Sequence, residues 1–101
     1  DFAMDRNVIN LLMGRRHQVG MLMLARGQLF METIEPGGMV AIVLTAGTAT
    51  ISRQRSGSQA PLHISPHVLR PVLLNVPGTY CVSAQDHVLG FRFIRLGGQH
   101  A

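Results

Sequence analysis

Glycine and proline interrupt this chain so often that no long regular element fits between them. The sequence has 101 residues with 11 Gly and 5 Pro. From residue 26 onward, turn residues recur about every 8–12 residues, with short apolar or alternating runs between them. The pattern excludes a long coiled coil, because Gly and Pro break helices. It predicts an all-β fold, a small antiparallel sandwich or jelly-roll-like barrel of about six to eight short strands.

The apolar runs locate these strands along the chain. In 48–53, Ala49 and Ile51 alternate with polar residues, which is typical of a strand with one buried face. The prolines of 61–71 confine that stretch to an edge strand or irregular structure. We expect strands at 19–25, 29–34, 39–44, 48–53, 72–76, 79–84 and 89–96.

The first residues predict a short helix instead of a strand. Met4, Val8, Leu11 and Leu12 recur at the spacing of one helical face, over residues 4–13. We therefore expect a single domain over 1–101, with a helical N-terminal arm (1–18) and a β-sandwich core (19–101).

Composition narrows the class of protein further. Hydrophobic residues make up 47% and charged residues 14% of the chain, which excludes intrinsic disorder. No apolar run approaches the roughly 18 residues of a membrane-spanning helix. The single cysteine, Cys81, excludes an internal disulfide and suits a reducing compartment. We expect a soluble protein, cytoplasmic or part of a virion sooner than secreted.

The positive charge is modest and comes entirely from arginine. The net charge is +4 and lysine is absent. Arg15, Arg16, Arg53 and Arg55 form the only tight basic clusters, and no aromatic residues alternate with them as a stacking surface for bases would require. Nucleic-acid binding is therefore the least favoured class. Arg53 and Arg55 also belong to a polar loop tip, 53–58, that suits a phosphate or another anion, although an exposed basic hairpin is the favoured explanation.

Few side chains are spaced so that they could form a metal site or a catalytic site. His63 and His67 are four apart and His87 can approach from a neighbouring strand, as three zinc ligands would. Pro66 breaks the pleat between the first two, so loop histidines explain the pattern better and we assign no metal. Cys81, Asp86 and His87 are the only group resembling a nucleophile, a base and an orienting acid. No motif supports them, so we predict no catalytic residues, no enzyme activity and no cofactor.

Two acidic residues are the remaining candidates for a catalytic pair. Glu32 and Glu35 lie three apart on either side of a turn. This spacing does not suit a pair of carboxylates for acid–base catalysis. We expect these residues to pair with arginines or to stay solvated.

The C-terminal third resembles the second half of a small cupin. The resemblance rests on Asn75-Val76-Pro77-Gly78-Thr79-Tyr80, a strand after it, and Phe91-Arg92-Phe93-Ile94. Cupins are jelly rolls that place a Pro-Gly turn before a metal-binding histidine. Here Tyr80 or Cys81 stands at that position, and the paired His and Glu of the first cupin motif have no counterpart near Gly47. The resemblance therefore implies a cupin-like fold that has lost its metal site.

The methionines suggest a surface that meets a partner. All six lie in the first 39 residues, and methionine is common at adaptable interfaces. The segment 21–24 carries apolar side chains on both faces, which an exposed strand would not tolerate. We expect self-association through residues 1–31, or binding to a larger assembly, with these interface residues: Met4, Val8, Leu11, Leu12, Met21, Leu22, Met23 and Leu24.

Three functional classes follow. The first and favoured one is a non-enzymatic structural subunit of a homo-oligomer or larger particle, by analogy with virion decoration or tail proteins. The second is a cupin-like module that binds a small molecule or a metal inside the barrel. The third is a basic nucleic-acid-associated protein, for which salt-sensitive binding is the discriminating observation.

Overall fold

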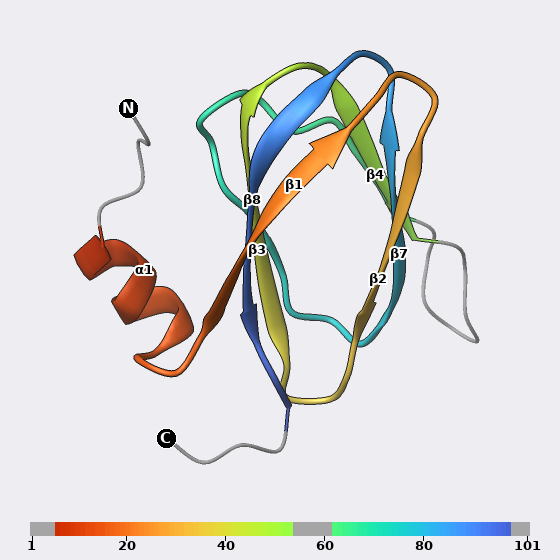
Figure 1. Ribbon diagram of the computed structural model, residues 1–101. Helices are drawn as coiled ribbons and strands as arrows, with labels where there is room; N and C mark the ends of the chain where they lie inside the picture. Colours follow the sequence, from red (N-terminus) through yellow and green to blue (C-terminus); the bar gives the residue numbers. More distant parts are fainter. Residues whose placement is uncertain (1–5, 54–61, 98–101) are drawn as a thin grey trace.

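The computed structural model of the chain describes residues 6–53 and 62–97, which fold as two packed antiparallel sheets with one helix outside them (Figure 1). The helix and strands are α1 (Arg6–Met13), β1 (Gln18–Leu24), β2 (Leu29–Ile34), β3 (Met39–Ala46), β4 (Ala49–Arg53), β5 (Leu62–Ile64), β6 (Val72–Leu74), β7 (Gly78–Ala84) and β8 (Val88–Arg95). The predicted fold class, an all-β sandwich with a short N-terminal helix, is confirmed.

Each sheet has four strands. Sheet A has the order β1-β8-β3-β6, and sheet B has the order β2-β7-β4-β5. Strands that follow one another in sequence therefore alternate between sheets through most of the chain, and the chain rolls around a common interior. Because β1 and β2 are edge strands of different sheets, they flank one side of the sandwich, which faces the viewer in Figure 1.

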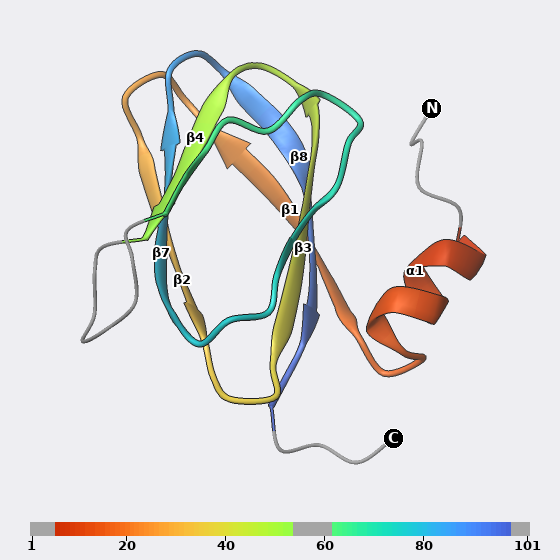
Figure 2. The same ribbon diagram turned by 180° about the vertical axis from the view of Figure 1, so that it is seen from behind.

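The opposite side of the sandwich lies between the other two edge strands, β5 and β6. Residues 65–71 connect them and run along this side, as Figure 2 shows. The main-chain N–H of Leu69 donates to the carbonyl oxygen of Leu44 at 2.7 Å, which ties this connection to β3. The proline-rich stretch thus forms the short edge strand and irregular connection that its composition predicts.

The core lies between the sheets because each strand alternates buried and exposed side chains. In β4, Ala49 and Ile51 point inward, and Tyr80, Val82 and Ala84 do so in β7. Sheet A contributes Leu22, Val40, Ile42, Leu44, Leu74 and Val88. The strands expected at 48–53 and 79–84 are therefore present.

Helix α1 covers part of the outer face of sheet A. Ile9 and Met13 are buried there against Ala41, Val43 and Phe93, which form a second apolar cluster. This cluster explains why β3 is apolar on both faces: one face meets sheet B and the other meets the helix.

The expected helix face needs correction. Leu11 is 84% exposed and Leu12 is half-buried against the second cluster, whereas Ile9 and Met13 carry the contact. Met4 lies outside the described residues, and the side chain of Val8 is not described. The predicted spacing placed the apolar stripe about one residue away from the face that packs on the sheet.

A close contact between two turns fixes one end of the sandwich. Gly47, between β3 and β4, has φ +92°, and a Cβ there would lie 1.9 Å from the carbonyl oxygen of His87. Only glycine combines that backbone conformation with that approach. The turns after β3 and after β7 are therefore pressed against each other.

Candidate binding site in the sandwich interior

A row of polar side chains crosses the otherwise apolar interior. In sheet B, Glu32 of β2 pairs in register with Tyr80 of β7, and Tyr80 pairs with Arg53 of β4. Residues paired in register lie on the same face of a sheet, so all three point toward sheet A. There Arg92 of β8 points inward between Gly90 and Ile94. We call Glu32, Tyr80, Arg53 and Arg92 the polar row.

Glu32 and Arg92 join the two sheets through a two-point ion pair. Nε of Arg92 donates to Oε1 of Glu32 at 2.8 Å, and Nη2 donates to Oε2 at 2.9 Å. The two side chains are only 10% and 16% exposed, respectively. The guanidinium carbon also lies 4.4 Å from the centre of the Phe30 ring, a cation–π contact that holds the plane of the guanidinium. The orientation of Arg92 is therefore fixed on two sides.

Tyr80 and Arg53 form the other half of the polar row. The Tyr80 hydroxyl donates to the carbonyl oxygen of Val76 at 2.6 Å and accepts from Nη1 of Arg53 at 3.0 Å. Tyr80 is 1% exposed, and its ring centre lies 5.5 Å from the Arg53 guanidinium carbon. Gly78 leaves room for the Arg53 stem, since a Cβ there would lie 3.0 Å from Cδ of Arg53. Because the buried Tyr80 hydroxyl both donates and accepts a hydrogen bond, its position in the polar row is fixed.

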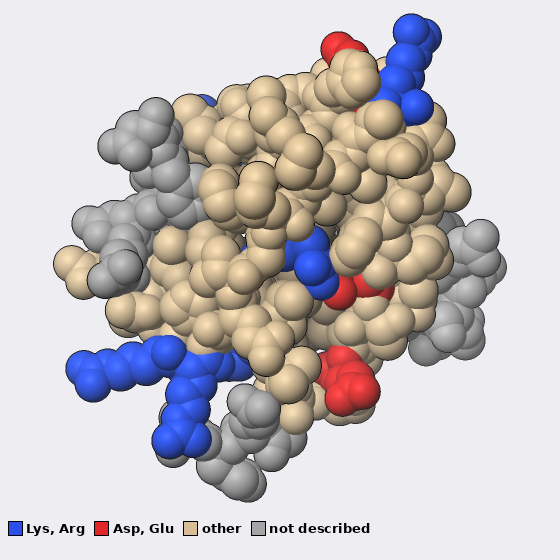
Figure 3. Space-filling model, in the orientation of Figure 1, with Lys and Arg blue, Asp and Glu red and all other residues tan. Residues whose placement is uncertain are grey.

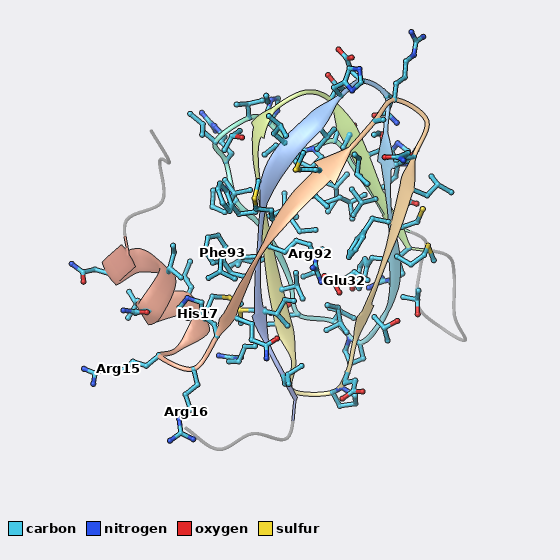
Figure 4. All side chains as sticks on the ribbon, in the orientation of Figure 1. Arg15, Arg16, His17, Glu32, Arg92 and Phe93 are labelled. Atoms are coloured by element: carbon cyan, nitrogen blue, oxygen red, sulfur yellow. The ribbon has the colours of Figure 1, made fainter. Side chains whose placement is uncertain are left out.

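Solvent reaches the polar row between β1 and β2. Figure 4 labels Arg92 and Glu32 between these two strands, and Figure 3, in the same orientation, shows blue and red atoms in a hollow at the middle of this face. Gly20 of β1 faces the interior there, and a Cβ on it would begin 3.5 Å from Nη1 of Arg92. We call this hollow the β1–β2 opening. Because Gly20 lacks a side chain, β1 leaves Nη1 uncovered.

The metal candidates do not assemble. His63 is exposed on β5, His67 is exposed in the connection to β6, and His87 is exposed in the turn between β7 and β8. Within 6–53 and 62–97, no three His, Cys, Asp or Glu side chains come together as a metal site.

The nucleophile candidates do not assemble either. Cys81 lies on the outer face of sheet B, where it pairs in register with Met31 and Ser52. Asp86 accepts a hydrogen bond from the main-chain N–H of its neighbour His87 at 2.8 Å. Cys81 is half-buried on a strand face, whereas Asp86 and His87 belong to the turn after that strand. The three residues do not form a catalytic arrangement.

The position where a cupin would carry its histidine holds part of the polar row. Tyr80 points into the interior and Cys81 points out. A phenol hydrogen-bonded to a guanidinium, with a second guanidinium across the row, repels a cation instead of binding it. The residues present in this interior do not fit the metal that a cupin-like fold implies.

The two carboxylates expected to pair with arginine or to stay solvated differ in their surroundings. Glu32 pairs with Arg92, while Glu35 is exposed in the turn between β2 and β3. Arg15 and Arg16 are exposed after α1, away from the interior (Figure 4). Arg53 belongs to the polar row, and Arg55 lies outside the described residues.

Two further hollows lie elsewhere on the sandwich. One of about 270 Å³ lies beside the turn after β7 and is lined by Met23, Gln28, His87 and Leu89, among others. The other, of about 90 Å³, is lined by residues that include Ile34, Met39 and Arg95. Neither is lined by members of the polar row, so they are separate from the β1–β2 opening.

The methionine-rich segment divides between core and surface. Leu22 is buried and Leu24 packs against the core, whereas Met21 and Met23 are 66% and 63% exposed. The segment is apolar on both faces because sheet B covers one of them. Leu22 and Leu24 are therefore core residues, and the expected interface reduces here to Met21, Met23 and their exposed neighbour Val19.

Sequence reasoning missed Arg92 as a site residue and the hydrogen bonds that Tyr80 makes with Val76 and Arg53. A signal for Arg92 was present: in the run Leu89 to Leu96, alternation places it on the same face as Gly90 and Ile94, between apolar neighbours. An arginine on the buried face of a strand requires a partner, because an unpaired buried charge is costly. The partner, Glu32, lies 60 positions away, and no local pattern links the two.

No family model and no curated protein sequence matches the chain. Three solved structures are similar in fold. A cupin superfamily protein from Desulfitobacterium hafniense matches with TM-score 0.64 and 12% identity, over 81% of this chain and 69% of that one. The Cupin_2 domain of an XRE family transcriptional regulator from Enterobacter cloacae gives 0.62 and 16%, over 79% and 81%.

The third, the capsular polysaccharide assembling protein CapF from Staphylococcus aureus, gives a TM-score of 0.67 and 10% identity, over 80% of this chain and 25% of that one. Among the residues that the structure describes, no helix is long and apolar enough to cross a bilayer. At these identities the structural matches establish fold and no activity. The chain has the rolled two-sheet architecture of the cupin, or double-stranded β-helix, proteins.

Proposed function

We propose that the chain is a cupin-like module that binds a small molecule at the polar row, which the ligand reaches through the β1–β2 opening. One observation carries the proposal: Arg92 is held rigidly inside an apolar sandwich while its Nη1 faces the opening at Gly20. Binding sites combine apolar walls with a few fixed polar groups in this manner. The cupin-type neighbours support this class better than a structural subunit.

The test maps ligand binding on the full chain by NMR. A set of small charged and neutral compounds is added to ¹⁵N-labelled protein, and main-chain amide shifts are followed. Binding at the polar row is expected to move the amides of Gly20, Phe30 and Arg92. Shifts confined to other surfaces, such as the hollow at His87, would contradict the proposal.

A variant that fills the opening sharpens the test. Gly20→Leu places a side chain over Nη1 of Arg92 and is expected to abolish these shifts. Val19→Leu is the matched control, since it adds bulk to the next residue of the same strand, whose side chain is 56% exposed on the outer face. Shifts that persist in Gly20→Leu would place the ligand elsewhere.

A second function, self-association, is supported by a different observation. β1 is an edge strand, and Val19, Met21 and Met23 leave its outer face apolar and exposed. The strand contains no charge and no proline, the usual devices that protect an edge from pairing. A second copy of the chain is the occupant we propose, because a strand without charge can pair antiparallel with itself without repulsion.

Light scattering after size exclusion tests this second proposal. We expect the chain to be a dimer or larger assembly at micromolar concentration, and Met21→Lys to shift it toward the 11 kDa monomer. Val68→Lys, at a 44% exposed position in the connection between β5 and β6, is the control for an added charge away from β1. A monomer at all concentrations would refute self-association and leave the binding proposal untouched.

A further inference from the structure

We propose that the ligand of the polar row is an oxyanion, a small molecule bearing a carboxylate or phosphate group, and that arginine holds it without a metal. This inference rests on the binding function proposed above and names its ligand class. Guanidinium groups are the side chains best suited to planar carboxylates and to phosphates. The polar row contains two of them.

The charges of the polar row do not balance. Arg92 and Arg53 contribute two positive charges, and Glu32 contributes one negative charge. Glu35 and Asp86, the other acidic residues that the structure describes, are exposed in turns. Of the segments outside the described residues, 54–61 and 98–101 contain no acidic side chain, and 1–5 contains Asp1 and Asp5. Counted over its four members, the polar row has one more positive than negative charge, and it lies in a largely apolar interior, where an anion is attracted more strongly than in bulk water.

Arg92 directs a specific donor group at the opening. Its Nε and Nη2 serve Glu32, and no hydrogen bond to Nη1 occurs among the residues of 6–53 and 62–97. Phe30 and Glu32 fix the guanidinium, so a ligand would not need to order a flexible side chain on binding. An oxygen anion entering past Gly20 would meet two N–H groups at Nη1.

Arg53 contributes at a greater distance. Arg53 and Glu32 flank Tyr80 in register, so their strands are separated by two spacings of about 4.8 Å each. Its guanidinium donates to the Tyr80 hydroxyl and brings a second positive charge to the polar row. Arg53 therefore strengthens the attraction for an anion at Arg92, whereas Glu32 weakens it.

These opposite effects define the experiment. Phosphate and acetate are titrated separately into the full chain at constant ionic strength, with chloride as the balancing salt, and amide shifts at Gly20 and Arg92 give the dissociation constants. Arg92→Lys, which keeps the charge but loses Nη1, is expected to weaken binding about tenfold. Glu32→Gln is expected to strengthen it, and Arg53→Gln is expected to weaken it.

Arg26→Gln is the matched control, because it removes one positive charge from an exposed turn. The affinity for phosphate and acetate should be unchanged in this variant. A loss of affinity as large as that in Arg53→Gln would mean that only the net charge of the protein matters, and it would overturn the inference. If Glu32→Gln does not fold, the affinities of Arg92→Lys and Arg53→Gln are compared with that of Arg26→Gln, and this comparison tests the inference. The probe that binds more tightly identifies the group as carboxylate or phosphate.

The failure of this inference is distinct from the failure of the binding function. If neutral compounds shift Gly20 and Arg92 while phosphate and acetate do not, the oxyanion inference is wrong and the binding module stands. If neither class of compound shifts these amides, both proposals fall. Weaker phosphate binding in Glu32→Gln than in the unmodified chain would also overturn the inference, since it would make Glu32 part of the anion site.

Discussion

Glu32 and Arg92 connect the two sheets of the sandwich on the side between β1 and β2, two edge strands that do not pair with each other. Glu32 lies on an edge strand of sheet B, and Arg92 lies on the strand beside the edge of sheet A. Their two hydrogen bonds of 2.8 and 2.9 Å replace the solvation that both charges lose. The ion pair therefore acts on the structure as well as on the proposed site.

Removing one member of this pair should destabilise the fold. Arg92→Met leaves the Glu32 carboxylate 10% exposed with no cation beside it, and we expect a loss of about 3 kcal/mol in the free energy of unfolding. Urea denaturation followed by circular dichroism measures this loss.

The double variant separates the charge from the packing. Glu32→Leu combined with Arg92→Met removes both charges and should recover most of the loss, because an apolar pair of similar volume is often as stable as a buried ion pair. A double variant as unstable as the sum of the two single variants would show that the two residues act independently.

The Tyr80 hydroxyl should contribute to stability through its two hydrogen bonds. Tyr80→Phe keeps the buried ring but leaves the Val76 carbonyl without its donor, and we expect a cost of about 1–2 kcal/mol. Thermal unfolding monitored by calorimetry gives the value. A variant as stable as the parent would mean that solvent satisfies Val76 and Arg53 equally well.

The contact between the turns at Gly47 and His87 should make position 47 intolerant of any side chain. In Gly47→Ala, the new Cβ would overlap the His87 carbonyl oxygen and the turns would have to separate, at a cost above about 3 kcal/mol. Gly27→Ala is the control for backbone strain alone, since Gly27 has a similar φ of +85° and open space around it. We expect the control to lose about 1 kcal/mol.

Helix α1 should be held by Met13 and not by Leu11. Met13→Ala removes a fully buried side chain between the helix and sheet A, and we expect a loss of about 2–4 kcal/mol. Leu11→Ala, at an 84% exposed site on the same helix, should change stability by less than about 0.5 kcal/mol. Equal losses in the two variants would mean that α1 packs on a face different from the one described.

The strands were predictable because alternation and turn residues are local signals. Ala49 and Ile51 alternate with polar residues, and the strand they predict at 48–53 is β4 (Ala49–Arg53). The helix face was harder to predict, because Val8 and Leu12 have the same four-residue spacing as Ile9 and Met13, and contact with sheet A decides which side of α1 is buried.

The polar row could not be predicted as a site, because its members come from four strands in two sheets. Tyr80 stood at the expected cupin position, and Arg53 stood out only as part of a basic loop. Their meeting with Glu32 and Arg92 depends on registers that sequence spacing does not encode. The resemblance of residues 75–94 to a cupin indicated the correct fold.

Gly20 makes one position of this chain suitable for chemical labelling. A cysteine there would place a thiol beside Nη1 of Arg92, since an added Cβ meets that atom at an ordinary contact distance of 3.5 Å. With Cys81→Ser removing the native thiol, an environment-sensitive fluorophore at residue 20 would sit at the β1–β2 opening and change its emission when the interior is occupied. The missing side chain thus provides an optical reporter for finding the ligand in mixtures where its identity is not known in advance.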